Sequence, residues 1–107
     1  MSDPATVFTD LAAEVEIPSE GTLSRVLYRD DLVRVVLFAF DTDQELTEHT
    51  ASVAAIIQVV SGRLDVTLGD EVVVAAPGSW LRMPPHLPHS VRALEPSIML
   101  LSMLSRS

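Results

Sequence analysis

The chain of 107 residues has no cysteine and no lysine. The absence of cysteine excludes disulfides, thiol catalysis and thiolate metal sites, so only histidine and oxygen side chains remain as ligands for a metal. All seven basic residues are arginines scattered from Arg25 to Arg106, and the formal net charge is −8. No basic cluster is present that could follow a phosphate backbone, and we therefore expect no nucleic-acid partner.

Long hydrophobic runs and a leader-like pattern are also missing. The longest apolar runs, Val53–Val60 and Ile98–Leu104, are far too short to span a bilayer, and no basic segment precedes an apolar one near the start. We therefore expect a cytoplasmic protein that makes no membrane contact. The balance of 48% hydrophobic and 21% charged residues is typical of a globular protein, and the length suits one domain.

The first 20 residues carry a pattern of their own. Asp3 and Pro4 form a plausible helix start, and Val7, Leu11 and Val15 follow at helical spacing. The pattern stops at Ile17-Pro18. It predicts a short helix or arm over residues 1–20, ahead of a single domain over residues 21–107.

After Gly21 the sequence changes to short β-branched and aliphatic runs separated by turn residues, which is typical of an all-β sandwich or barrel. Turn chemistry at Asp30-Asp31, Ser61-Gly62, Gly69-Asp70 and Pro77-Gly78, taken alone, indicates a meander of hairpins. The predicted strands are Leu23–Tyr28, Leu32–Phe40, Glu45–Thr50, Ala54–Val60, Arg63–Leu68, Val72–Ala75, Trp80–Met83, His89–Leu94 and Ile98–Leu104.

Two of these strands are apolar on both faces, namely Leu32–Phe40 and Ile98–Leu104. In a small antiparallel protein, one face of a strand usually meets water, so this pattern indicates a second buried surface beyond the core. A homodimer interface is the simplest source of that surface, and we expect a homodimer.

The three histidines, His49, His86 and His89, lie within a pattern of glycines and prolines. Gly62 lies 13 residues after His49, while Gly78, Pro84 and His89 follow at a second regular spacing. These spacings resemble the two motifs of the cupin superfamily. The first motif is Gly, five residues, His, one, His, three or four, Glu, six, Gly, and the second is Gly, five, Pro, one, Gly, two, His, three, Asn.

The resemblance covers residues 43–93 and implies the cupin barrel, an all-β jelly roll or double-stranded β-helix. It implies that His49 and His89 reach one interior point from separate strands, where cupins usually hold a divalent metal. The matching residues are His49, Gly62, Gly78, Pro84 and His89. The departures are Asp43 and His86 at glycine positions, Ala51 at the second histidine, Ala55 at the glutamate and Ala93 at the asparagine.

The two alanines at ligand positions bear directly on a metal. A site with only His49 and His89 should hold Zn, Fe, Mn or Ni more weakly than one with three or four protein ligands. His86 is either a third ligand at the mouth of the barrel or an exposed loop residue, and the second alternative is favoured. Glu45 could reach the rim, whereas Glu48, adjacent to His49, should face the other way.

Apolar side chains supply the rest of a candidate pocket. With His49 directed inward, strand alternation after the next turn should place Ala55, Ile57 and Val59 inward and Gln58 outward. Core packing is the commoner role for the large side chains Phe38, Phe40, Trp80, Met83, Met99 and Met103. As residues that contact a ligand we predict His49, His89, Trp80, Met83 and Phe38.

Three functions are compatible with these observations. The favoured one is a small-molecule-binding protein whose interior pocket is anchored by His49 and His89. The alternative is a metal-dependent enzyme, a dioxygenase or isomerase of a small organic substrate, with a metal held by His49, His89 and His86. A sensor module of a transcription regulator is a third, which would need a separate DNA-binding partner because no helix-turn-helix segment is present. No hydrolase nucleophile motif occurs.

Overall fold

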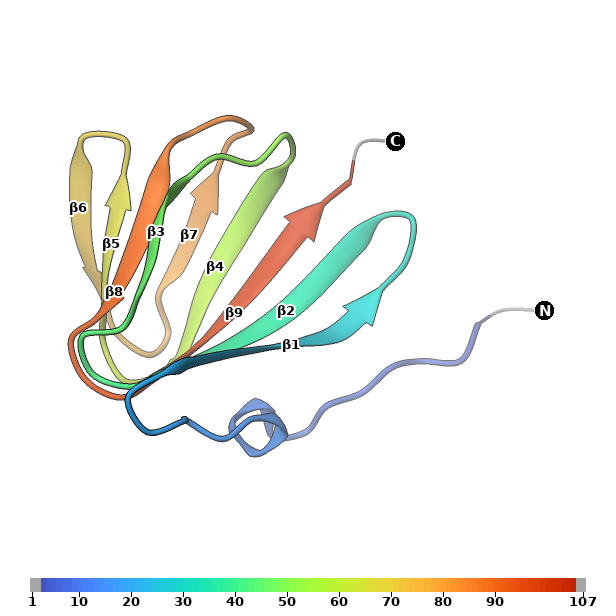
Figure 1. Ribbon diagram of the computed structural model, residues 1–107. Coiled ribbons are helices and arrows are strands. Elements are labelled where there is room, and N and C mark those ends of the chain that lie inside the picture. Colours follow the sequence, from blue (N-terminus) through green and yellow to red (C-terminus); the bar gives the residue numbers. More distant parts are fainter. Residues whose placement is uncertain (1–2, 106–107) are drawn as a thin grey trace.

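The computed structural model describes residues 3–105 and shows nine strands in two antiparallel sheets (Figure 1). The larger sheet has the strand order β1-β2-β9-β4-β7, and the smaller has the order β3-β8-β5-β6. The strands are β1 Thr22–Arg29, β2 Val33–Phe40, β3 Glu45–His49, β4 Ala54–Ser61, β5 Leu64–Leu68, β6 Glu71–Ala75, β7 Trp80–Met83, β8 His89–Ala93 and β9 Ser97–Leu104. The predicted all-β jelly roll is confirmed, and every predicted strand agrees with an observed one within one residue at each end.

The order of pairing differs from the meander indicated by the turns. Among the described strands, only β1 with β2 and β5 with β6 pair as sequence neighbours. All other pairs, such as β2 with β9 and β3 with β8, join strands that are distant in sequence. A turn signal marks where a strand ends but does not select its partner, so the meander was wrong.

The first hairpin shows how local chemistry sets a turn. Asp30 follows β1, and its Oδ1 accepts hydrogen bonds from the backbone N–H groups of Leu32 at 2.7 Å and Val33 at 2.9 Å. Its Oδ2 accepts a hydrogen bond from the Tyr28 hydroxyl at 2.6 Å. An aspartate that caps its own turn in this way reverses the chain without a glycine.

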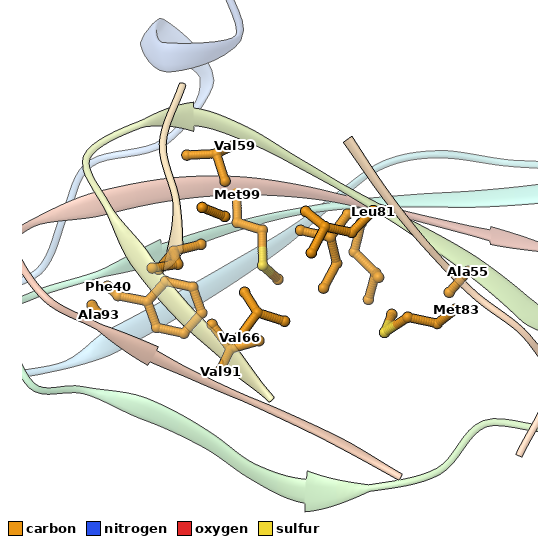
Figure 2. Packing of buried hydrophobic residues seen from close by; sticks show 13 residues of the cluster. Phe40, Ala55, Val59, Val66, Leu81, Met83, Val91, Ala93 and Met99 are labelled. Atoms are coloured by element: carbon orange, nitrogen blue, oxygen red, sulfur yellow. The ribbon is translucent and has the colours of Figure 1, made fainter. Parts of the chain in front are cut away.

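The core lies between the sheets and is almost entirely apolar (Figure 2). Strand alternation supplies it, as in β4, where Ala55, Ile57 and Val59 are buried and Gln58 is exposed. The other buried members are Phe40, Leu64, Val66, Ala75, Leu81, Met83, Val91, Ala93, Met99 and Leu101. The predicted inward and outward residues of this strand are confirmed.

The N-terminal arm covers part of the outer face of the larger sheet. Val15 and Ile17 pack against a second buried cluster formed by Leu37, Ala39 and Ile98. Part of the outer apolar face of β2 and β9 therefore has a partner surface within this chain. The arm contains one turn of 3₁₀ helix, Leu11–Glu14, which agrees with the prediction of a short helix or arm ahead of the strands.

Two local features explain why the helical segment is so short. Asp10 makes no side-chain capping hydrogen bond, and Pro18 limits the segment to a length at which an isolated helix is marginal. Within residues 3–105 no helix is long and apolar enough to cross a membrane.

Candidate functional site

His49 and His89 lie opposite each other in the paired strands β3 and β8. Their ring centroids are 4.1 Å apart, with the ring planes inclined at 62°. His89 is 6% exposed, whereas His49, the last residue of β3, is exposed. The predicted pairing of the two rings is confirmed, but the expectation that both lie in the interior is wrong for His49, which is exposed at the end of β3 while His89 is buried.

A β-bulge in β3 brings His49 to this position. Leu46 pairs with Val91, and three residues later His49 pairs with His89, which is only two residues from Val91. In a regular antiparallel ladder Glu48 would stand opposite His89. The extra residue therefore puts an imidazole, instead of a carboxylate, beside His89. Sequence reasoning missed the bulge because its short run of polar residues carries no glycine or proline signal.

Backbone carbonyl groups fix the tautomers of both rings. The Nδ1 of His49 lies 2.8 Å from the carbonyl oxygen of Thr47, and the Nδ1 of His89 lies 2.9 Å from that of Leu87. A carbonyl oxygen only accepts, so each Nδ1 donates its hydrogen. In the neutral rings both Nε2 atoms are then left as acceptors, ready for a hydrogen-bond donor or a metal.

Two loops join the strands at this end of the barrel. Residues 50–53 lead from His49 to β4, and residues 84–88 lead from Met83 to His89. The backbone N–H of His86 donates a hydrogen bond of 2.7 Å to the carbonyl of Ala51, which ties the loops together. The ends of β3 and β7 and the beginnings of β4 and β8 therefore form one rim.

His86 lies on this rim with an exposed side chain and a φ of 68°. Within residues 3–105 no group of three or more His, Asp or Glu side chains is arranged to hold a metal ion. His86 therefore does not join His49 and His89 in a three-histidine site. Glu45 and Glu48 are both exposed, and Glu45 pairs with the outward-facing Arg92.

The wall across the barrel from the pair is small and apolar. Ala55 is 3% exposed and pairs on one side with Met83 and on the other with Met103. In Figure 2, Ala55 and Met83 lie together at one end of the core. Neither Ala55 nor Ala51, which occupy two ligand positions of the motif, carries a donor atom. This end of the barrel thus carries two imidazole nitrogens on the smaller sheet and methyl and thioether groups on the larger one.

The remaining predicted contact residues have different locations. Met83 is buried in the core at 1% exposure, and Phe38 faces the interior, where its ring stacks on Phe40 at a centroid distance of 6.0 Å. Trp80 is 59% exposed and pairs with the outward-facing Gln58. Trp80 therefore lies on the outer surface of the larger sheet and does not line the interior. Its strand begins at Trp80, and alternation from the buried Leu81 places it outward.

Comparison with known proteins agrees with this geometry. Residues 36–104 match the model of the cupin domain. Comparison with curated proteins gives no match.

Several solved structures have the same architecture. The chain is similar to a conserved protein of unknown function from Streptococcus pyogenes, SPY1581, with 30% identity, coverage of 99% of this chain and 92% of that one, and a TM-score of 0.87. It is similar to a cupin superfamily protein from Desulfitobacterium hafniense, with 23% identity, coverage of 96% and 94%, and a TM-score of 0.87. It is also similar to KdgF from a Halomonas species, with 25% identity, coverage of 89% and 92%, and a TM-score of 0.78.

Proposed function

This chain belongs to the cupin family, and from that premise we propose that it binds a small organic molecule at the His49–His89 pair. The observation that carries the proposal is that both histidine rings carry their hydrogen on Nδ1. Both Nδ1 atoms are engaged by carbonyl groups, so both Nε2 atoms of two adjacent rings present acceptors to one ligand. The ligand therefore needs a hydrogen-bond donor, such as a hydroxyl or an amide N–H, at one end.

The surroundings of the pair favour a ligand with an apolar body. Ala55, Met83 and Met103 form the wall across the barrel, and Leu68 pairs with His89 on its other side. Methionine side chains adapt their shape to a bound molecule, and a few polar groups within an apolar wall fix its orientation.

The donor set does not suit a tightly held resident metal. Zinc, iron, manganese or nickel sites of high affinity use three or four protein ligands, and the described residues provide two imidazoles and no third group. We therefore assign no catalytic step to a metal. The free Nε2 atoms are nevertheless suitable metal ligands, which keeps a weakly bound divalent ion as the second candidate.

The binding proposal is tested by ligand screening with variants of each histidine. The probes are small phenols, azoles and hydroxy acids, and binding is followed through the imidazole nitrogen NMR signals. We expect His49→Ala and His89→Ala each to weaken binding by about tenfold or more. Each variant removes one imidazole acceptor and leaves the donor group of the ligand without a hydrogen bond. His86→Ala is the matched control and should bind normally. Equal losses in all three variants, or no loss in the first two, would contradict the proposal.

The metal alternative is tested on protein prepared without a histidine tag. We expect substoichiometric metal that a chelator removes, and Zn²⁺ or Co²⁺ titration should show weak binding that His49→Ala and His89→Ala abolish and His86→Ala preserves. Stoichiometric metal that survives dialysis against a chelator would instead support the metal-dependent enzyme.

A further inference from the structure

Two arginines stand directly opposite each other at the turn end of the β1–β2 hairpin. Arg29 of β1 pairs with Arg34 of β2, beyond an irregularity in β1 between Val26 and Tyr28. Residues that pair across antiparallel strands direct their side chains to the same face of the sheet. Whichever face Arg34 occupies, Arg29 therefore shares it.

The alternation of β2 assigns that face to the interior side of the larger sheet. Val36, Phe38 and Phe40 follow Arg34 at intervals of two on the same face of the strand, and Phe40 belongs to the main core while Phe38 packs against it. The neighbour of Arg34 in β9 is Met103, which also packs against that core. Arg29 and Arg34 thus lie on the same side of the larger sheet as Met103, Ala55 and Met83.

The register also places the arginines at the same end of the barrel as the histidines. Arg34, Met103, Ala55 and Met83 form one cross-strand row in the larger sheet. With strands about 5 Å apart, the Cα of Arg34 is about 10 Å from that of Ala55. Met83 and Ala54 flank the two loops that lead to His89 and from His49. The row that begins with Arg34 therefore ends on the rim that holds the histidine pair.

Two positive charges face each other at this pair, in a chain whose net charge is negative. Like charges directly opposite each other in a sheet are unfavourable. The chain has 15 Asp and Glu residues and a net charge of −8, so carboxylates that could neutralise the two guanidinium groups are abundant. Within residues 3–105 the ion pairs are Arg25 with Glu14 and Arg92 with Asp43, and neither involves Arg29 or Arg34. A bound anion between two guanidinium groups would relieve the repulsion and accept several directed hydrogen bonds.

We propose that Arg34, assisted by Arg29, binds an anionic group of the ligand whose opposite end donates a hydrogen bond to the His49–His89 pair. The inference rests on the proposed function and narrows its ligand class to small organic acids or phosphate esters with a polar group at the far end. The apolar row of Met103 and Ala55 lies between the two polar ends and contacts the body of the ligand.

The test uses hydroxy acids of graded chain length, each compared with its neutral amide, and inorganic phosphate as a separate probe. Binding is measured by calorimetry and by NMR for the wild type, Arg34→Gln and the control Arg82→Gln. Arg82 is also exposed and lies in the same sheet, but it pairs with Ile56 on the outer face. Its substitution therefore removes the same charge on the face away from the proposed site. Thermal unfolding of each variant checks that the fold is intact.

We expect a hydroxy acid to bind at least about tenfold more tightly than its amide, with this preference lost in Arg34→Gln and kept in Arg82→Gln. Preference for phosphate over the carboxylates would identify a phosphate ester as the ligand type, and the reverse would identify an organic acid. Equal binding of acid and amide, or equal losses in the two arginine variants, would overturn the inference.

Variants of the histidines separate this inference from the proposed function. If acid and amide bind equally and both lose affinity in His49→Ala, the histidine site stands and the anion subsite does not. If the acid depends on Arg34 but not on His49 or His89, the anion site stands apart and the proposed function fails. Absence of binding by every probe contradicts the anion subsite.

Discussion

Of the four glycines, Gly62 leaves the least room for a side chain. It has a φ of 81°, and a Cβ at this position would overlap Ser97 Oγ and the Pro96 carbonyl oxygen and lie 2.7 Å from Ser97 Cα. Ser97 is fully buried, and its hydroxyl accepts a hydrogen bond of 3.0 Å from the Arg63 N–H, so it has no room to move. We expect Gly62→Ala to lower the free energy of unfolding by about 3 kcal/mol or more, measured by urea denaturation.

Gly78 supplies the matched control for that substitution. Its φ of 94° is also in the left-handed region, but a Cβ there would meet nothing within 4 Å. Gly78→Ala should therefore cost only the backbone strain, about 1–2 kcal/mol. If the two variants lose the same free energy of unfolding, steric overlap with Ser97 is not the reason why position 62 requires glycine.

Two departures from the cupin motif also have a backbone explanation at this scale. Asp43 and His86 stand where the motif has glycine, and their φ values are 67° and 68°. Aspartate and histidine are among the residues that adopt this conformation more readily than most. The sequence could predict that these positions are turns. It could not predict that the exposed side chain of His86 stays outside the pair, because this depends on how the two rim loops join.

The N-terminal arm is the element whose contribution to stability is easiest to measure. Ile17 packs against the outer cluster of Leu37, Ala39 and Ile98, whereas Val7 is 72% exposed. We expect Ile17→Ala to lower the free energy of unfolding by about 1–2 kcal/mol, since it removes partly buried methyl groups. Val7→Ala should change it by less than about 0.5 kcal/mol. Urea denaturation of both variants checks this, and equal effects would mean that the arm does not pack on the sheet in solution.

The turns that begin and end β2 predict a dependence of stability on pH. The hydroxyl of Tyr28 and the N–H groups of Leu32 and Val33 lower the pKa of Asp30 below its ordinary value of 3.8. The N–H groups of Glu20 and Thr42 likewise lower the pKa of Asp41. A carboxylate whose pKa is lowered by folding stabilises the native state above its unfolded pKa, and this stabilisation is lost as pH falls through the folded pKa.

We therefore expect the free energy of unfolding to decline as pH falls below 3.8, and the double variant Asp30→Asn with Asp41→Asn to show a flatter decline. Tyr28→Phe should flatten it by a smaller amount, because it removes one of the three hydrogen bonds to Asp30. Urea denaturation across this pH range provides the measurement. Parallel curves for the wild type and the double variant would refute the assignment.

Strand boundaries were predictable because the alternation of apolar residues and the turn residues are both local. The bulge in β3 was not, because the step from Leu46 to His49 becomes irregular only against the register of β8. Trp80 was placed in the pocket because an aromatic residue near a glycine turn is compatible with either face. The alternation that begins at the buried Leu81 decides in favour of the outer face.

For the whole molecule, the strand order could be predicted only through the resemblance to cupins. Pairings such as β2 with β9 join segments more than fifty residues apart, and no local signal selects them. The histidine pair depends on the same long-range order, since His49 and His89 meet only because β3 pairs with β8.

A homodimer remains our expectation at this scale. The arm covers only part of the outer face of the larger sheet, and Leu32, in the turn before β2, and Leu104, the last residue of β9, are 62% and 37% exposed. We expect light scattering at micromolar concentration to give twice the chain mass of 11.6 kDa. Leu104→Arg should shift the protein towards the monomer, and Val72→Arg, an exposed position on the smaller sheet, should not. A monomeric wild type would end this expectation.

The bulge in β3 also has a consequence for the chemical character of the site. With the bulge, three steps from Leu46 to His49 match two steps in β8, so loss of one residue between them would keep His49 opposite His89 in a regular ladder. If the bulge straightened without such a loss, Glu48 would take that place and the site would gain a negative charge. The register of β3, as well as the identity of its residues, therefore decides whether the partner of His89 is an imidazole or a carboxylate.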